Sequence, residues 1–172
     1  MTPLCRALTP DDAAAFLELR LRGLAECPEA FASSYEEERL MPLITVESRL
    51  AAKPDSYTFG AFEEQQLVAV VGLVREHHVK LAHKAFVWGM YVAPDSRCRG
   101  IGAALLSFAL EHAERALRVR QVNLGVNTGN TAAVSLYRRL GFQQYGLERE
   151  FLQVGGVFHD EYQMVWRAPR AA

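Results

Sequence analysis

A loop rich in arginine and glycine carries residue types that bind phosphate groups. The sequence Arg-Cys-Arg-Gly-Ile-Gly at residues 97–102 follows an apolar run at 85–92 that predicts a buried strand, which Pro94 terminates. Apolar residues at helical spacing come after the loop. This order places free backbone N–H groups, the positive end of a helix dipole and two guanidinium groups at one point. The chemistry that it predicts is the binding of a pyrophosphate.

Three kinds of phosphate loop contain glycines at this spacing, and the residues after Gly102 distinguish them. A Walker A loop needs Lys followed by Ser or Thr, whereas two alanines follow Gly102. A dinucleotide fingerprint needs a third Gly or Ala and an acid about 20 residues later. Leu105 occupies the first of these positions, and the predicted strand at 121–127 ends without an acid. The third pattern, Arg/Gln-x-x-Gly-x-Gly/Ala, matches residues 97–102 in full.

A second pattern lies further along the chain, at residues 127–142. Asn130 is expected to cap a helix, and Tyr137 follows in that helix, ahead of a Gly-Phe pair at 141–142. Taken alone, Tyr137 is interpreted as a half-buried core aromatic. Beside the phosphate loop it becomes a candidate catalytic group. A phenol with a pKa of about 10 stays protonated at neutral pH and can give a proton to a thiolate.

The two patterns together resemble the coenzyme loop and the second signature of the GNAT (Gcn5-related N-acetyltransferase) superfamily. The resemblance covers essentially the whole chain and is strongest over residues 85–142. It implies acetyl-CoA as co-substrate, no metal, and direct transfer of the acetyl group, in a ternary complex, to a primary amine of a small molecule or a peptide. Two alternatives stay open: a non-catalytic acyl-CoA-binding or regulatory module on the same fold, and an acyltransferase that uses a longer acyl-CoA.

The elements that must position these residues follow from hydrophobic periodicity and turn signals. Strands are predicted at residues 4–8, 57–62, 67–75, 85–92, 121–127, 147–154 and 157–166. The first predicted helix begins at Thr9, and others cover 46–52, 100–118 and 130–140. This order predicts a mixed α/β (α+β) fold in a single domain over residues 1–167, with a loose tail at 168–172. The sheet is expected to be mostly antiparallel and flanked by helices.

The predicted strand at residues 85–92 has a glycine in its interior. Regular alternation would place one set of residues on one face, namely Phe86, Trp88, Met90 and Val92. The other face would carry Ala85, Val87, Gly89 and Tyr91. Gly89 predicts a bulge or a close backbone approach. The GNAT resemblance gives this a role, since it implies fourth and fifth strands that splay apart to admit the pantetheine arm.

The resemblance assigns a role to each motif. Tyr137 would be the acid for the leaving thiolate, and backbone N–H groups at residues 90–92 would polarise the thioester carbonyl. The amides of residues 97–103 would bind the pyrophosphate, with Arg97 preferred over Arg99 for a charge-assisted bond. The residues expected to contact the coenzyme are Met90, Tyr91, Val92, Arg97, Cys98, Arg99, Gly100, Ile101, Gly102, Ala103 and Asn130.

No motif identifies the group that takes the proton from the amine. Members of the family often carry a Glu in the fourth strand, but residues 85–92 contain no acid. The candidates are Glu36, Glu37, Glu38, His78 and His83, followed by Asp160 and Glu161. Each has a simpler interpretation: a solvated surface residue for the first five, and a structural charge pair for the last two.

Cys98 lies between two arginines, directly before the predicted helix at 100–118. Positive surroundings make a thiol reactive, so Cys98 is expected to alkylate readily and to be protected by acetyl-CoA. A covalent acetyl-cysteine intermediate is disfavoured here, because the loop would hold phosphates well away from the thioester.

Composition excludes several classes of partner. The chain has 172 residues, 50% of them hydrophobic, and a net charge of −1, so no nucleic-acid partner is expected. Its longest apolar run, at 67–74, is too short to span a bilayer, and its first residues do not resemble a signal peptide. Three cysteines form neither a disulfide framework nor a metal site, and a cytoplasmic setting is expected. A homodimer, if formed, would use the last hairpin, since relatives pair through edge strands or C-terminal segments.

Overall fold

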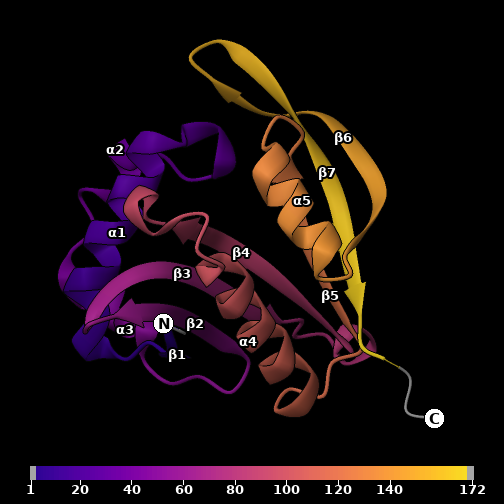
Figure 1. Cartoon of the computed structure of the whole chain (residues 1–172), viewed down its shortest axis with the longest axis horizontal. Coiled ribbons are helices and arrows are strands. Elements are labelled where there is room, and N and C mark those ends of the chain that lie inside the picture. The colour runs from indigo at the N-terminus through magenta and orange to yellow at the C-terminus, as the bar shows by residue number, and fades with distance from the viewer. Residues whose placement is uncertain (1–2, 170–172) are drawn as a thin grey trace.

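The computed structural model describes residues 3–169 and contains a seven-stranded sheet in the order β1-β2-β3-β4-β5-β7-β6 (Figure 1). The strands are β1 (Leu4–Ala7), β2 (Ser56–Glu63), β3 (Gln66–Arg75), β4 (Lys84–Val92), β5 (Gln121–Asn127), β6 (Gln143–Val154) and β7 (Val157–Arg167). The α-helices are α1 (Ala13–Glu26), α2 (Tyr35–Glu38), α3 (Leu43–Leu50), α4 (Ile101–Arg115) and α5 (Thr131–Arg139). All neighbouring strands are antiparallel except β4 and β5, which are parallel. The predicted mixed α/β fold with a mostly antiparallel sheet is confirmed.

The predicted order of elements is confirmed, with some ends displaced. The β2–β3 hairpin turns at Glu64 and Gln65, which both have positive φ, as two-residue hairpin turns require. Helix α3 begins earlier than predicted, directly after Pro42. Strand β6 also begins earlier than predicted. Its first residues are exposed and show no apolar alternation, so the sequence did not indicate a strand there. The one-turn helix α2 was not predicted.

Helices cover both faces of the sheet, and each face has its own core (Figure 1). Helix α4 buries an apolar stripe that includes Leu105 and Leu106 against β2, β3 and β4. On the opposite face, Phe16 and Leu24 of α1 pack with Val46 of α3. The apolar periodicity of these helices therefore buries one stripe of each against the sheet.

Strands β4 and β5 pair only at their first residues and then separate. Their register runs from Lys84 opposite Gln121 to Phe86 opposite Asn123. Beyond Phe86, no described strand lies against the β5-facing edge of β4. The predicted splay of the fourth and fifth strands is confirmed. It leaves a V-shaped opening at the carboxyl ends of two parallel strands, where ligands of open α/β sheets bind.

A bulge in β4 corrects the predicted alternation of its side chains. Gly72 of β3 lies opposite Trp88, and Val70 lies opposite Tyr91, so β4 contains one extra residue between these pairs. Gly89, with a φ of 63°, lies in this interval, and the predicted bulge is confirmed.

The extra residue changes which side chains share a face. Met90 and Val92 pack in the α4-side core with Ala85 and Val87, whereas Tyr91 packs in the α1-side core. The prediction that Tyr91 shares a face with Ala85 and Val87 is therefore wrong. After the bulge the side chains alternate again, but each one faces the side opposite to the one that regular alternation would give.

The end of β7 is tied to the sheet. The N–H of Ala168 donates to the carbonyl of Arg120 at 3.1 Å. Residues 170–172 of the predicted loose tail lie outside the described residues. None of the described helices has the length and apolar character that crossing a membrane requires.

Candidate active site

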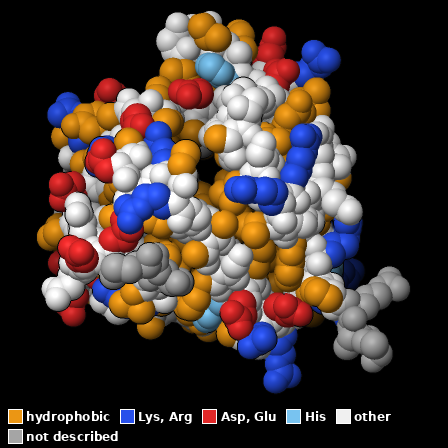
Figure 2. All heavy atoms as spheres, in the orientation of Figure 1, with side chains coloured by type: hydrophobic (Ala, Val, Ile, Leu, Met, Phe, Trp, Pro, Cys, Tyr) orange, Lys and Arg blue, Asp and Glu red, His pale blue; other side chains and the backbone are white. Residues whose placement is uncertain are grey.

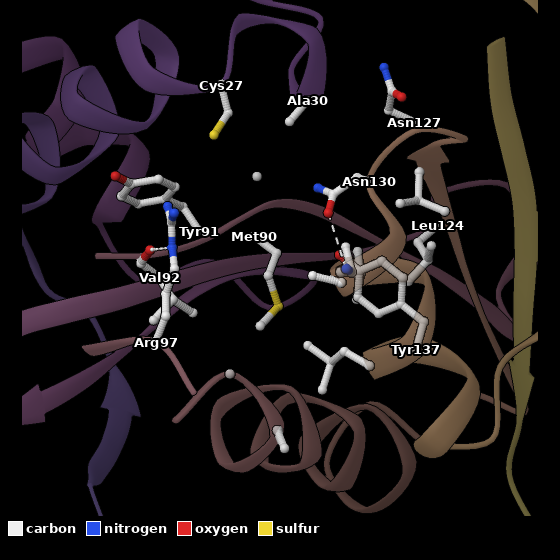
Figure 3. Close-up of a pocket in the computed structure, with 18 of the residues that line it drawn as sticks. Cys27, Ala30, Met90, Tyr91, Val92, Arg97, Leu124, Asn127, Asn130 and Tyr137 are labelled. Carbon is white, nitrogen blue, oxygen red and sulfur yellow. Dashed lines mark hydrogen bonds between the residues drawn. The ribbon is translucent and has the colours of Figure 1, made fainter. Parts of the chain in front are cut away.

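A cavity of about 430 Å³ occupies the opening between β4 and β5. Figure 2 shows the molecule hollowed there, with basic side chains on both sides of the hollow. The structure brings nearly all of the predicted site residues to this cavity: Met90, Tyr91, Val92, Arg97, Cys98, Gly100, Ile101, Gly102, Ala103, Asn130 and Tyr137. Arg99 is absent from the described lining. Figure 3 shows β4 crossing the site, with Arg97 beside Tyr91 and with Asn130 and Tyr137 opposite.

The first turn of α4 presents unpaired backbone donors to the cavity. Gly100 precedes the helix with a φ of 80°, a conformation that glycine adopts without strain. The first helical bond joins the N–H of Ala104 to the carbonyl of Gly100 at 3.0 Å. The N–H groups of residues 101–103 consequently have no helical acceptor, and they carry the positive end of the helix dipole. This arrangement binds anions, phosphates above all.

The two arginines of the loop are each held by a carboxylate. Arg97 forms an ion pair with Glu26 at 2.9 Å, and its Nε donates to the carbonyl of Val92 at 2.9 Å. Arg99 pairs with Glu63 at 2.7 Å. These contacts fix the loop against α1 and β2 before any ligand binds. Arg97 keeps its place at the cavity, and Arg139 adds a second basic side chain to the lining.

Tyr91 and Glu26 form a hydrogen-bonded pair at the α1 side of the cavity. The Tyr91 hydroxyl donates to a carboxylate oxygen of Glu26. Burial, and then Glu26 itself, raises the pKa of Tyr91 to about 12. The bond from Tyr91, followed by Arg97, lowers the pKa of Glu26. Glu26 is thus a stabilised carboxylate and a weak base.

Tyr137 is positioned by a well-capped helix. The Asn130 side chain accepts a hydrogen bond from the N–H of Ala133 at 3.1 Å, so the predicted N-cap of α5 is confirmed. The Tyr137 ring is 7% exposed and packs 5.8 Å from the Phe142 ring. Its hydroxyl forms no hydrogen bond with a described residue, and burial raises its pKa to about 12. The ring is fixed, while the hydroxyl keeps its hydrogen for a ligand.

Comparison with known proteins identifies the family. A model of the acetyltransferase (GNAT) family matches residues 24–142. The chain belongs to the GNAT family. It is 35% identical to the N-alpha-acetyltransferase RimI of Mycobacterium tuberculosis over 117 residues, which are 68% of this chain and 70% of RimI. It spans only 20–28% of the length of several other curated relatives.

Solved GNAT structures agree with this assignment. A GNAT acetyltransferase from Streptococcus pneumoniae is 25% identical and superposes with a TM-score of 0.85 over 96% of this chain and 99% of that one. The yncA protein of Salmonella typhimurium, solved with its cofactor acetyl-CoA, has a TM-score of 0.81 over 100% of this chain and 97% of that one. At 18% identity, the second likeness shows the fold alone.

The first five candidate bases differ in burial and in their hydrogen-bond partners. Glu38 is 8% exposed and forms a bidentate pair with Arg20, at 2.9 Å and 3.0 Å, so the expectation of a solvated surface residue is wrong for Glu38. Glu37 caps α2 through Ser34, and those bonds lower its pKa.

The remaining three of those candidates are also outside the main cavity. Within residues 3–169, its lining includes neither His78 nor His83. Both precede β4, at the closed end of the β4–β5 opening. Glu36 instead lines a second, outer cavity between the α1–α2 region and the tip of the β6–β7 hairpin.

Other residues of the lining were missed by the sequence analysis. Cys27 and Ala30 come from the segment after α1 and close one side of the cavity (Figure 3). Phe31 of the same segment also lines the cavity. Trp88 and Asn127 contribute from the two splayed strands. Asn127 begins the pattern at 127–142 but was given no role there, and the other four belong to no local motif. The splay of β4 and β5 was the only available signal for the strand residues, since it exposes side chains along both strands.

Proposed function

We propose that this protein transfers the acetyl group of acetyl-CoA to a primary amine, by direct attack in a ternary complex. The observation that carries the proposal is the convergence on one cavity of three groups with different tasks. These are the free amides of α4, the unpaired edge of β4 and the hydroxyl of Tyr137. Direct acetyl transfer needs a bound phosphate, a polarised carbonyl and a donor for the leaving sulfur.

The donor half of the reaction uses α4 and β4. The amides of residues 101–103 would bind the pyrophosphate, and Arg97 and Arg139 would add positive charge at the cavity. Because β5 diverges, the β4 edge beyond Phe86 keeps free backbone groups. These would hold the pantetheine arm and polarise the thioester carbonyl, in the manner of an oxyanion hole. The acetyl-CoA bound to yncA, a protein of the same fold, supports this choice of donor.

The acceptor half would use the outer cavity. That cavity, of about 500 Å³, is lined by the α1–α2 region and by the tip of the β6–β7 hairpin. Phe31 lines both cavities, so they adjoin at this residue. An amine entering through the outer cavity would reach the thioester from the side opposite α4. The name of the RimI relative describes acetylation of an α-amino group, and a peptide with a free N-terminus is therefore the first acceptor to try.

A screen of amines tests the function. Purified protein, acetyl-CoA and one acceptor at a time are mixed, and the released CoA thiol is measured. A peptide with a free α-amino group, a free amino acid and a polyamine represent the acceptor classes. We expect thiol release that depends on one of these amines. Tight acetyl-CoA binding without release above the protein-free rate would instead indicate a binding module.

Cys98 provides an independent probe of where the coenzyme binds. The thiol is exposed and lines the main cavity, so we expect it to alkylate faster than Cys5 and Cys27, whose pKa values burial raises. Saturating acetyl-CoA should slow alkylation of Cys98 about tenfold or more, as read by mass spectrometry of its peptide, and leave Cys5 unaffected. An unchanged rate at Cys98 would contradict the placement of the pyrophosphate at this loop.

A further inference from the structure

A carboxylate lies against a glycine of the main cavity lining, in the space that this glycine leaves empty, although it does not itself belong to the described lining. Glu161 of β7 pairs with Asn127 of β5, and its carboxyl group extends over Gly125, which belongs to the cavity lining. A Cβ atom at Gly125 would lie 2.0 Å from Oε1 of Glu161 and 2.8 Å from Oε2. The Glu161 carboxyl group therefore occupies the space that a side chain at position 125 would fill. Only glycine at that position lets the carboxyl group approach β5 so closely.

The carboxyl group lies on the acceptor side of β5. Leu124 and Val126 face the core that contains Tyr137, so alternation turns Gly125 and its neighbour Asn127 to the opposite face. The Asn127 side chain there donates to the carbonyl of Glu29, in the segment after α1, at 3.0 Å. Glu161 and Tyr137 are thus on opposite faces of β5, beside the same cavity. An amine and a leaving thiolate need separate proton-transfer groups, and this arrangement supplies one for each.

The surroundings of Glu161 favour a basic carboxylate. Burial raises its pKa, the nearby Glu148 of β6 raises it further, and a hydrogen bond from Gln163 at 2.8 Å lowers it in part. No ion pair joins Glu161 to a cation within residues 3–169. On β5, the residues beside the carboxyl group are Gly125 and Asn127, and neither side chain titrates. Glu26 and Glu38 differ, because arginines pair with both.

We propose that Glu161 is the general base of the acetyl transfer, taking a proton from the acceptor ammonium directly or through one water. The assignment rests on the proposed function and supplies the base that the acid-free strand β4 lacks. It replaces the interpretation of Asp160 and Glu161 as a structural charge pair. Asp160 has a separate role, since its Oδ1 accepts a hydrogen bond from the N–H of Glu150 at 2.9 Å.

The proton balance of this step is complete. Glu161 takes one proton from the ammonium, and the neutral nitrogen then forms a C–N bond to the thioester carbonyl carbon. When the intermediate collapses, the C–S bond breaks, and the nitrogen loses its second proton to water. The thiolate leaves hydrogen-bonded to the Tyr137 hydroxyl and then takes a proton from water. Glu161 returns its proton to solvent, so one proton is released for each amide formed.

The test compares Glu161→Gln with Glu150→Gln, which removes the charge of an exposed acid on β6. The substrate is the amine of the screen that wild type acetylates fastest, and kcat and kcat/KM are measured between pH 5 and 10. We expect Glu161→Gln to lower kcat about 100-fold or more and Glu150→Gln to lower it less than about threefold. Wild type should show an acidic limb from Glu161, with an apparent pKa above the ordinary value of about 4.3. Glu161→Gln should lose that limb and keep the ionisation of the amine.

Acetyl-CoA affinity, measured by calorimetry, separates a folding defect from a catalytic one. Unchanged affinity in Glu161→Gln, with a lower kcat and a lost acidic limb, supports the base. Wild-type kcat in the variant, or a lower kcat with the acidic limb retained, overturns the assignment and leaves the transferase function standing. If none of the amines in the screen causes wild type to release thiol, the proposed function fails, and the assignment of Glu161 fails with it.

Discussion

Replacing Tyr137 by phenylalanine is expected to lower kcat about 10²- to 10⁴-fold, with a smaller effect on the KM for acetyl-CoA. The substitution removes one oxygen from a ring that is 7% exposed and fixed by packing against Phe142. The ring and its contacts remain, so the fold should be preserved. The lost group is the hydroxyl that we propose as the donor to the leaving sulfur, so its effect should appear in the chemical step.

The raised pKa of Tyr137 specifies how the hydroxyl acts. At about 12, the phenol stays protonated across the whole neutral range, so a donor is always present. Complete transfer to a thiolate with a pKa of about 8.5 would be uphill by about 5 kcal/mol. We therefore expect the hydroxyl to stabilise the departing sulfur as a hydrogen-bond donor, while water completes the protonation.

Steady-state kinetics with the fastest amine of the screen measure this effect. Tyr57→Phe is the matched control, because the Tyr57 hydroxyl donates to the carbonyl of Pro54, at 3.3 Å, and is outside the described cavity lining. The control should keep kcat within about threefold. A wild-type kcat in Tyr137→Phe would remove Tyr137 from the mechanism. A large rise in KM with unchanged kcat would make it a binding residue.

Replacing Gly100 by glutamate should weaken acetyl-CoA binding at least about 100-fold, or about 2.7 kcal/mol. Gly100 directly precedes the free amides of residues 101–103. A carboxylate at this point would compete for the N–H groups and repel the pyrophosphate. The site is open, since no atom lies within 4 Å of a Cβ built at Gly100. The loss should thus come from charge and not from a clash.

A second glycine provides a close control for backbone strain. Gly156, in the β6–β7 turn, has a φ of 83°, against 80° for Gly100, and it also has nothing within 4 Å of a built Cβ. Gly156→Glu carries the same charge and a similar strain of about 1–3 kcal/mol. Calorimetric titration with acetyl-CoA should show wild-type affinity for Gly156→Glu and lost affinity for Gly100→Glu. Equal affinity in both variants would place the pyrophosphate elsewhere.

The sequence by itself determined the parts of the protein that depend on local signals. The loop at 97–102 and the N-cap at Asn130 are contiguous patterns, because a helix terminus collects its donors from neighbouring residues. The hairpins and the helix at α4 follow from alternation and periodicity in the same way. The family could also be recognised, since both of its motifs lie within short stretches of the chain.

Tertiary structure decided what happens between distant segments. The bulge at Gly89 was predictable, but its register against β3 reversed the faces of Tyr91 and its neighbours. The burial of Glu38 depends on Arg20, a residue of another helix. Such effects come from packing and desolvation, which a one-dimensional pattern does not record.

The proposed acceptor side of the site also depends on contacts between distant segments and not on local sequence signals. Glu161 and Gly125 are far apart in the chain, and each looks ordinary in its own strand. The antiparallel pairing of β5 and β7 brings the carboxyl group of one over the backbone of the other. The proposed phosphate site could be predicted from the sequence because its amides are consecutive in the chain. The proposed base could not, because only the pairing of strands brings its carboxyl group to the cavity lining.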